Sequence, residues 1–208
     1  MSQTAFKFRQ RGGKRAGAGR KPAGRKARVS HKRRARFETP AAVHVTLVVT
    51  QRVWNLRSRR CFRVVEACLA DALGRFGLRV IEFTVLGNHL HLLVEADNDL
   101  ALSRGMQGLN IRVAKALNRL MGEPGRVFGD HYHSRVLETP TELVNALAYV
   151  LGNHAHHFGG WRGIDPFSSA VYDLERRERV LADPRTWLLR HGWRRARRIP
   201  QWLRELRE

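Results

Sequence analysis

Two strand patterns separated by only two residues place the strongest constraint on how this chain can fold. Residues 78–86 are rich in β-branched and aromatic side chains, and the segment 89–95 begins with histidines that alternate with leucines. The intervening pair, Gly87-Asn88, is typical of a tight β-turn. The segment therefore predicts an antiparallel hairpin, to which other strands can be added.

The second strand of this hairpin carries two histidines on one face. His89 and His91 alternate with Leu90, Leu92 and Val94, so the histidines face one way and the aliphatic side chains face a core. The two imidazoles are about 7 Å apart along the strand, from a rise of roughly 3.3 Å per residue. At that spacing one metal ion can accept a nitrogen from each ring.

The remaining patterns predict a mixed α+β fold of the ferredoxin-like type, β-α-β-β-α-β with an antiparallel sheet, followed by a further helix. A capping box, Thr139-Pro140-Thr141-Glu142, predicts that this last helix starts at 139–140, and it should end between Gly152 and Gly159. The other expected elements are a strand with Val43, Val45, Leu47 and Val49 inward, a helix over 58–76, a helix over about 100–121 and a strand over 133–138.

We expect the helices to cover one face of the sheet and to leave the other free. The valine and leucine positions should meet the helices. The free face should then present His44, Thr46, His89 and His91.

The charge of the chain is concentrated at one end. The first 36 residues hold five lysines, nine arginines and no acidic residue, and so carry +14 of the formal net charge of +21. Such a segment cannot bury a core and is expected to be disordered on its own. We expect three regions: a disordered basic arm over 1–39, a folded domain over 40–158, and a basic helical extension over 159–208, with short packed helices and an exposed arginine run at 194–198.

A basic arm on a folded body favours nucleic acid as the partner. The arm lacks the apolar stripe of an interfacial membrane helix, and no stretch reaches transmembrane length. Cys61 and Cys68 lie seven residues apart on one helix, beyond disulfide reach. With no signal peptide visible, the chain is expected to be cytoplasmic and associated with the nucleoid.

The helix after Thr139 carries a tyrosine off its apolar stripe. The stripe is formed by Leu143, Val144, Leu147, Val150 and Leu151, and Tyr149 lies roughly 160° from its centre at 100° per residue. Asn153 lies one turn beyond Tyr149 on the same face. Tyr149 is therefore either a surface tyrosine or a functional hydroxyl.

The pattern of His89-Leu90-His91, followed about sixty residues later by Tyr149 and Asn153, resembles the single-tyrosine HUH transposases. The similarity spans about 40–158 and is greatest to the REP-associated tyrosine transposase branch of the IS200-like family. Members of that branch usually have proline after the asparagine, where this chain has His154.

The resemblance implies an enzyme that cleaves and rejoins single-stranded, hairpin-containing DNA, and its precedent includes homodimers. Tyr149 would attack a DNA phosphate to form a 5′-phosphotyrosine and release a 3′-hydroxyl. His89, His91 and Asn153 would hold a divalent metal ion that polarises the phosphate. Imidazole and amide ligands with open positions suit Mg²⁺ or Mn²⁺.

Other polar residues are weaker candidates. Tyr132 is the rival nucleophile, although packing or DNA contact is the more ordinary role for it. Glu95 shares the histidine face, as a metal-assisting group or a surface residue at the strand end. The histidines at 154, 156 and 157 are expected to be solvated or to contact phosphate. The predicted DNA contacts are Arg104, Arg112, Lys115 and Arg119 on the helix over 100–121, and Arg20 and Lys21 in the arm. An ordinary solvated face is the favoured interpretation for at least half of the four on the helix.

Two other functions are compatible with parts of the pattern. A nucleic-acid-binding protein of the same fold could bind a strand on its free sheet face without cutting it, but such sheets usually expose aromatic side chains. A histidine-dependent phosphoesterase would need a further histidine or hydroxyl in register. Position 93 is leucine, which disfavours that function.

Overall fold

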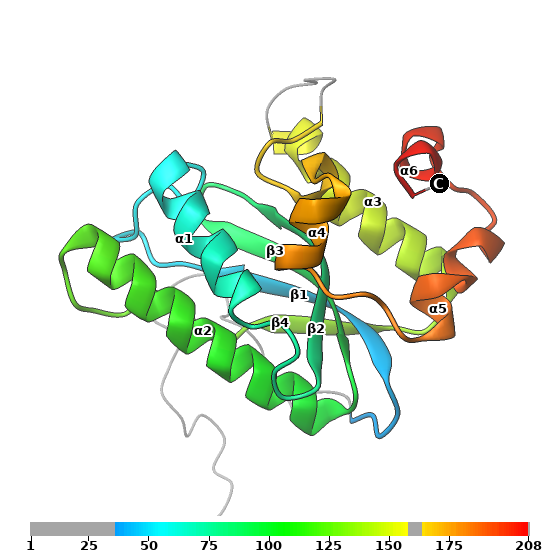
Figure 1. The fold of residues 1–208 in the computed structure, drawn as a ribbon, viewed down its shortest axis with the longest axis horizontal. Coiled ribbons are helices and arrows are strands. Elements are labelled where there is room, and N and C mark those ends of the chain that lie inside the picture. The colour runs from blue at the N-terminus through cyan, green and yellow to red at the C-terminus, as the bar shows by residue number, and fades with distance from the viewer. Residues whose placement is uncertain (1–35, 158–163, 208) are drawn as a thin grey trace, which may run out of the picture. The chain divides into compact units, whose positions relative to one another are not determined.

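The computed structural model describes residues 36–157 and 164–207, without the side chains of 153–157. The predicted order of strands and helices is confirmed (Figure 1). The main elements are β1 (Ala41–Val48), α1 (Arg59–Ala70), β2 (Leu78–Val85), β3 (His89–Ala96), α2 (Asp99–Met121), β4 (His133–Leu137), α3 (Pro140–His157), α4 (Leu174–Val180), α5 (Trp187–Arg190) and α6 (Gln201–Arg207).

The four strands form one antiparallel sheet in the order β2-β3-β1-β4. The hairpin predicted around Gly87-Asn88 joins β2 to β3, and Leu86 N donates to His89 O across the turn at 2.8 Å. Because β1 pairs with β3, the histidine strand lies at the centre of the sheet. This is the ferredoxin-like arrangement expected from the sequence.

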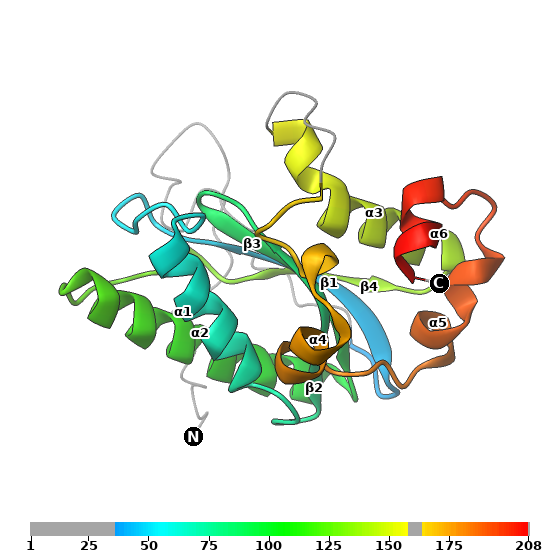
Figure 2. The ribbon, with the colours of Figure 1, turned by 45° about the horizontal axis from the view of Figure 1, so that its top comes forward.

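The first core lies between the sheet and the helices α1 and α2, which pack on the same side (Figures 1 and 2). The aliphatic side of the histidine strand enters this core as predicted, with Leu90, Leu92 and Val94 at most 1% exposed. Helix α2 contributes Met106 and Leu109, among other residues of its predicted stripe. Burial of this apolar surface is the main force that holds the two helices against the sheet.

The opposite face of the sheet is not free, so that prediction was wrong. Helix α3 and the C-terminal extension cover much of it and form a second core that includes Leu93 and Trp193, which are 0% and 2% exposed. The apolar stripe of α3 needs a partner surface, and the leucine at position 93 provides part of it. The histidines lie at one end of this face, and the buried Glu95 lies at the other end.

Helix α1 is shorter than predicted. It ends at Ala70, and the chain then turns through residues with positive φ, at Gly74, Phe76 and Gly77. Leu73 and Phe76 continue the helical spacing in sequence but do not join the buried stripe, and Phe76 is 55% exposed. Glycine readily adopts positive φ, so these glycines override the hydrophobic periodicity.

The C-terminal extension runs along the outer edge of β2. Val85 N donates to Phe167 O at 2.8 Å, and Ala182 N donates to Val80 O at 2.9 Å. The buried Asp165 accepts two bonds of 2.8 Å from the Arg57 guanidinium. The extension therefore covers an otherwise open sheet edge.

Buried carboxylates attach the extension at two further points. Glu82 of β2 accepts from Arg177 at 2.7 Å and forms a 3.5 Å ion pair with Arg207. Glu95 of β3 accepts from the backbone of Arg185 and Thr186. The predicted exposed tail was therefore partly wrong: the arginines at 194, 195, 197 and 198 are exposed, but α6 follows them and packs back on the body.

Two smaller predictions concern covalent and membrane chemistry. Cys61 and Cys68 are both free, in line with their spacing, and both are buried. Within 36–157 and 164–207, no helix is sufficiently long and apolar to pass through a bilayer.

Candidate active site

Four aromatic rings gather at the polar end of the second sheet face. The ring centroid of Tyr149 lies 4.9 Å from that of His91 and 5.7 Å from that of His44, edge-on to both. His44 stacks on His91 at 5.4 Å, and His89 meets His91 at 4.8 Å. The structure thus brings together, within one chain, the tyrosine and both histidines that the sequence singled out.

The sheet register explains this gathering. In the β1–β3 pairing, Thr46 lies opposite His91, so His44 projects from the same face two residues along β1. The start of α3 sets the position of Tyr149 along the helix: Glu142 N donates to Thr139 Oγ1 at 3.2 Å, and Thr139 N donates to Glu142 Oε2 at 3.3 Å. The predicted capping box is therefore confirmed, and it places Tyr149 nearly three turns further on, over the histidines.

Neighbouring side chains orient both rings of the histidine pair. Thr46 Oγ1 lies 3.1 Å from His91 Nδ1, and Asn88 Oδ1 lies 2.7 Å from His89 Nδ1. In each case the contact is made at Nδ1. Contacts of this kind fix the rotation and tautomer of a ligand histidine and direct Nε2 toward the site.

The chain contains three tyrosines, and Tyr149 is more exposed than the other two. Tyr132 and Tyr172 are both 7% exposed and belong to the first core. The Tyr172 hydroxyl donates to Glu66, and burial followed by this contact raises its pKa above the usual value. Tyr149 is 44% exposed, so a large substrate can reach it.

His44 is a member of the cluster that sequence reasoning placed on the face but did not assign to the site. Burial, and secondly the positive charge of Arg135, hold the pKa of His44 below its ordinary value. His44 Nε2 is buried and has no hydrogen-bond partner among the described residues. Its alternation with the valines of β1 was the one signal in the sequence, and it indicated only the face on which His44 lies. That β1 would pair with β3 and bring His44 to His91 could not be seen in the sequence.

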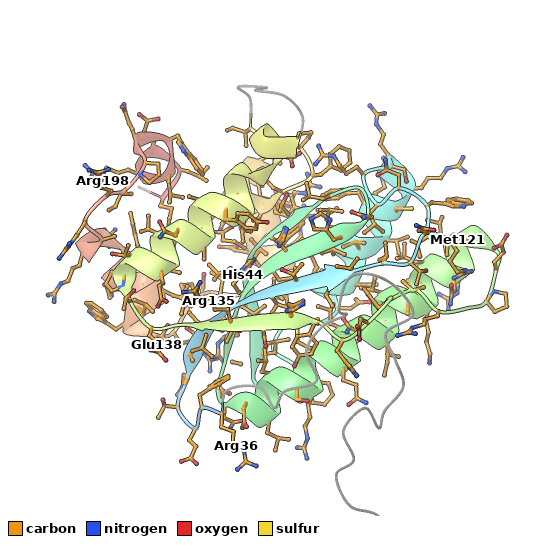
Figure 3. All side chains as sticks on the ribbon, turned by 180° about the vertical axis from the view of Figure 1, so that it is seen from behind. Arg36, His44, Met121, Arg135, Glu138 and Arg198 are labelled. Carbon is orange, nitrogen blue, oxygen red and sulfur yellow. The ribbon has the colours of Figure 1, made fainter. Side chains whose placement is uncertain are left out.

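Arg135 adds positive charge beside the cluster. It lies opposite His44 in the β1–β4 register, and Figure 3 shows the two residues on neighbouring strands. Its side chain is 71% exposed and pairs with Glu142 at 2.7 Å. An exposed guanidinium at this position can meet a phosphate that approaches Tyr149.

The predicted third ligand can be placed only along the backbone. Helix α3 continues to His157, so Asn153 lies one turn beyond Tyr149 on the same helix. Its side chain, like those of His154, His156 and His157, lies outside the described residues. Among the described residues, those of this cluster included, no group of three or more His, Cys, Asp or Glu side chains is arranged to hold a metal ion.

The predicted DNA contacts on α2 do not join the site. Arg104, Lys115 and Arg119 are exposed and Arg112 is half-buried, but α2 packs on the opposite face of the sheet from Tyr149. Figure 2 shows α2 and α3 on different sides of the strands. Arg20 and Lys21 lie outside the described residues.

Both roles considered for Glu95 were wrong. Its side chain is 0% exposed, and Arg79 Nε donates to it at 2.7 Å. Burial alone would raise the pKa of Glu95, but hydrogen bonds from Thr186, Arg79 and Arg185 outweigh burial and lower it. Glu95 is therefore a structural carboxylate that holds the C-terminal extension.

Among residues 36–157 and 164–207, a helical tyrosine thus faces a strand-borne histidine pair on a mixed α/β fold with an antiparallel sheet. The family model of the IS200-like transposases matches residues 39–150, more than half of the chain. The chain belongs to this family of transposases.

One solved structure supports the fold. A REP-associated tyrosine transposase bound to a REP hairpin matches with a TM-score of 0.54 and 14% identity, covering 76% of this chain and 93% of that one. A putative transposase from Deinococcus radiodurans R1 matches with a TM-score of 0.40 and 14% identity, covering 56% of this chain and 91% of that one. No curated protein matches the chain significantly.

Proposed function

We propose that this transposase cleaves and rejoins single-stranded DNA through a covalent bond to Tyr149. The observation that carries the proposal is the 4.9 Å separation between the rings of Tyr149, an exposed tyrosine, and His91. Among the three tyrosines, only Tyr149 is both accessible and adjacent to the histidine pair. The resemblance to REP-associated transposases favours hairpin-containing DNA as the substrate and a homodimer as the active form.

The chemistry follows from the groups at the site. Tyr149 Oη attacks the phosphorus, a P–O bond to Tyr149 forms, and the bond from phosphorus to the 3′-oxygen breaks. The phenolic proton is passed to the departing 3′-oxygen through solvent. The products are a 5′-phosphotyrosine and a free 3′-hydroxyl, and the reverse attack by a 3′-hydroxyl rejoins the strand.

A divalent ion fits the donors present. Two imidazoles oriented through Nδ1 can offer Nε2 to one ion, and the buried, unbonded Nε2 of His44 marks a polar space beside them. His89 and His91 would hold Mg²⁺ or Mn²⁺, with Asn153 as the third ligand. When bound, the ion would act as a Lewis acid on the scissile phosphate.

Charge on the body supports an anionic substrate. Arg135 stands beside the cluster, and the exposed arginines at 194, 195, 197 and 198 belong to the extension that packs on α3. Arginine binds phosphate oxygens through charge-assisted hydrogen bonds. The covered sheet face argues against the rival binding protein, which would use an open sheet as its platform.

The test is incubation with folded single-stranded oligonucleotides and Mn²⁺ or Mg²⁺, followed by denaturing electrophoresis. A covalent protein–DNA adduct should form, and EDTA should prevent it. Tyr149→Phe should abolish the adduct, whereas the matched control Tyr132→Phe should retain it. An adduct that persists in Tyr149→Phe would exclude Tyr149 as the nucleophile, and binding without any adduct would favour the non-catalytic binding protein.

A further inference from the structure

We propose that Trp202 of α6 stacks on an unpaired base of the DNA strand held at Tyr149. The inference rests on the proposed function and extends it, because it assigns to the C-terminal extension a part of the single-strand binding surface. Neither the family match, which ends at residue 150, nor the sequence patterns assign a role to this segment.

Trp202 lies against the helix that carries the nucleophile. A Cβ atom built on Gly152 of α3 would lie 3.3 Å from Cζ2 and 3.5 Å from Cη2 of the Trp202 ring. Gly152 is three residues after Tyr149, and residues three apart are neighbours on a helix surface. The missing side chain at Gly152 therefore lets the edge of the Trp202 ring approach α3 within one turn of the nucleophile.

Residues other than Trp202 hold α6 in place, so the Trp202 ring is left partly exposed. Its neighbour Leu203 is 0% exposed and belongs to the second core, whereas Trp202 itself is 43% exposed. Arg207 fastens the end of the same helix, by its ion pair with Glu82 and by a bond to Leu189 O at 3.4 Å. A rigidly held aromatic ring with a solvent-facing surface is the arrangement that single-strand binding proteins use to stack bases.

The positive charge around Trp202 favours a polyanion as its partner over an uncharged, apolar one. Residues 187–207 contain seven arginines and a single acidic residue, Glu205. Arg204 is exposed on α6, and Figure 3 shows Arg198 beside this helix. In Figures 1 and 2, α6 lies beside α3, which carries Tyr149. A strand that places a phosphate at Tyr149 would find both an aromatic face and cationic groups along its path.

The extension offers a matched control. Trp187 of α5 is 51% exposed, similar to Trp202, and lies under Arg195, whose guanidinium carbon is 5.2 Å from the ring centroid. Its ring packs on Gly192 within the extension. Substitution of either tryptophan removes an exposed ring of the same kind, but only Trp202 contacts the nucleophile helix at Gly152.

The experiment measures binding of the full chain to (dT)12 in EDTA, so that cleavage does not interfere. Trp202→Leu keeps an apolar contact with Gly152 and should weaken binding roughly 5- to 100-fold, as expected for loss of one stacked base. Trp202→Phe keeps a flat ring and should remain within about threefold of wild type. Trp187→Leu should bind as wild type does. Equal affinity of Trp202→Leu and wild type, or an equal loss in Trp187→Leu, would overturn the inference.

A second measurement does not depend on how the variants fold. Photocrosslinking of unmodified protein to (dT)12 that carries one 5-bromodeoxyuridine should label the peptide containing Trp202, and labelling confined to other peptides would count against stacking there. Adduct formation by wild type tests the proposed function separately. An adduct without any effect of Trp202→Leu on binding defeats only this inference, whereas a loss of binding without an adduct supports it and defeats the proposed function.

Discussion

The ring of Tyr149 lies 4.9 Å from the ring of His91 in the same chain. This relationship joins residues 58 positions apart and predicts that one chain holds a complete site. A mixture of Tyr149→Phe with His91→Ala, each inactive alone, should therefore form no adduct. The measurement is denaturing electrophoresis of the mixture after co-refolding, which allows mixed dimers to form. Recovery of adduct would show that α3 serves the partner subunit instead.

His44 is expected to position Tyr149 through its ring rather than through its nitrogens. It stacks on His91 and meets the Tyr149 ring edge-on, so its removal frees both rings. His44→Ala should slow single-turnover adduct formation roughly 10- to 100-fold, because small misplacements of a nucleophile are costly. His44→Phe, which keeps a ring, should recover most of the rate. If His44→Phe forms the adduct as slowly as His44→Ala does, the nitrogens of His44 are needed and ring packing alone is not sufficient.

Leu93 tests the covered sheet face. It is 0% exposed in the second core, beneath α3 and the extension. Leu93→Ala should lower the free energy of unfolding by about 2–5 kcal/mol, the usual cost of such a cavity. Leu174→Ala, at a site 73% exposed, should change it by less than about 0.5 kcal/mol. Urea denaturation measures both; a small effect at Leu93 would mean that the face is open in solution.

Glu95 should make stability depend on pH. The folded pKa of Glu95 lies below its ordinary value of 4.5, so its stabilising effect is present above pH 4.5 and is lost as the pH falls through the folded pKa. Glu95→Gln should cost roughly 3 kcal/mol at pH 7, as for a broken buried ion pair, and the difference from wild type should shrink below about pH 4.5. The exposed Glu178→Gln serves as control in parallel urea titrations. A difference that stays constant with pH would contradict this assignment.

The basic arm should dominate non-specific DNA affinity. Residues 1–36 carry +14, and each phosphate contact contributes about 0.7–0.9 to the slope of log affinity against log salt. Deletion of residues 1–36 should flatten that slope for single-stranded DNA, measured by fluorescence anisotropy between about 50 and 200 mM salt. An unchanged slope would place the phosphate contacts on the folded body.

Much of the fold was accessible to sequence reasoning because its signals are local. The alternation on either side of Gly87-Asn88 and the capping box at Thr139 predicted elements that the structure confirms. The helix predicted over 58–76 failed at its end, since hydrophobic spacing continued past glycines that turn the backbone. Local patterns thus located the elements better than they located the ends of those elements.

The sequence by itself singled out the candidate site residues: His89 and His91 on one strand face and Tyr149 off the apolar stripe of a capped helix. Periodicity and capping depend only on neighbours along the chain, so they can be read without coordinates. Tertiary structure alone decided that β1 adds His44 to the cluster, that Glu95 is buried, and that α6 brings Trp202 to Gly152. Those relationships depend on which elements become neighbours, and that choice is made by burial of apolar surface summed over the whole domain.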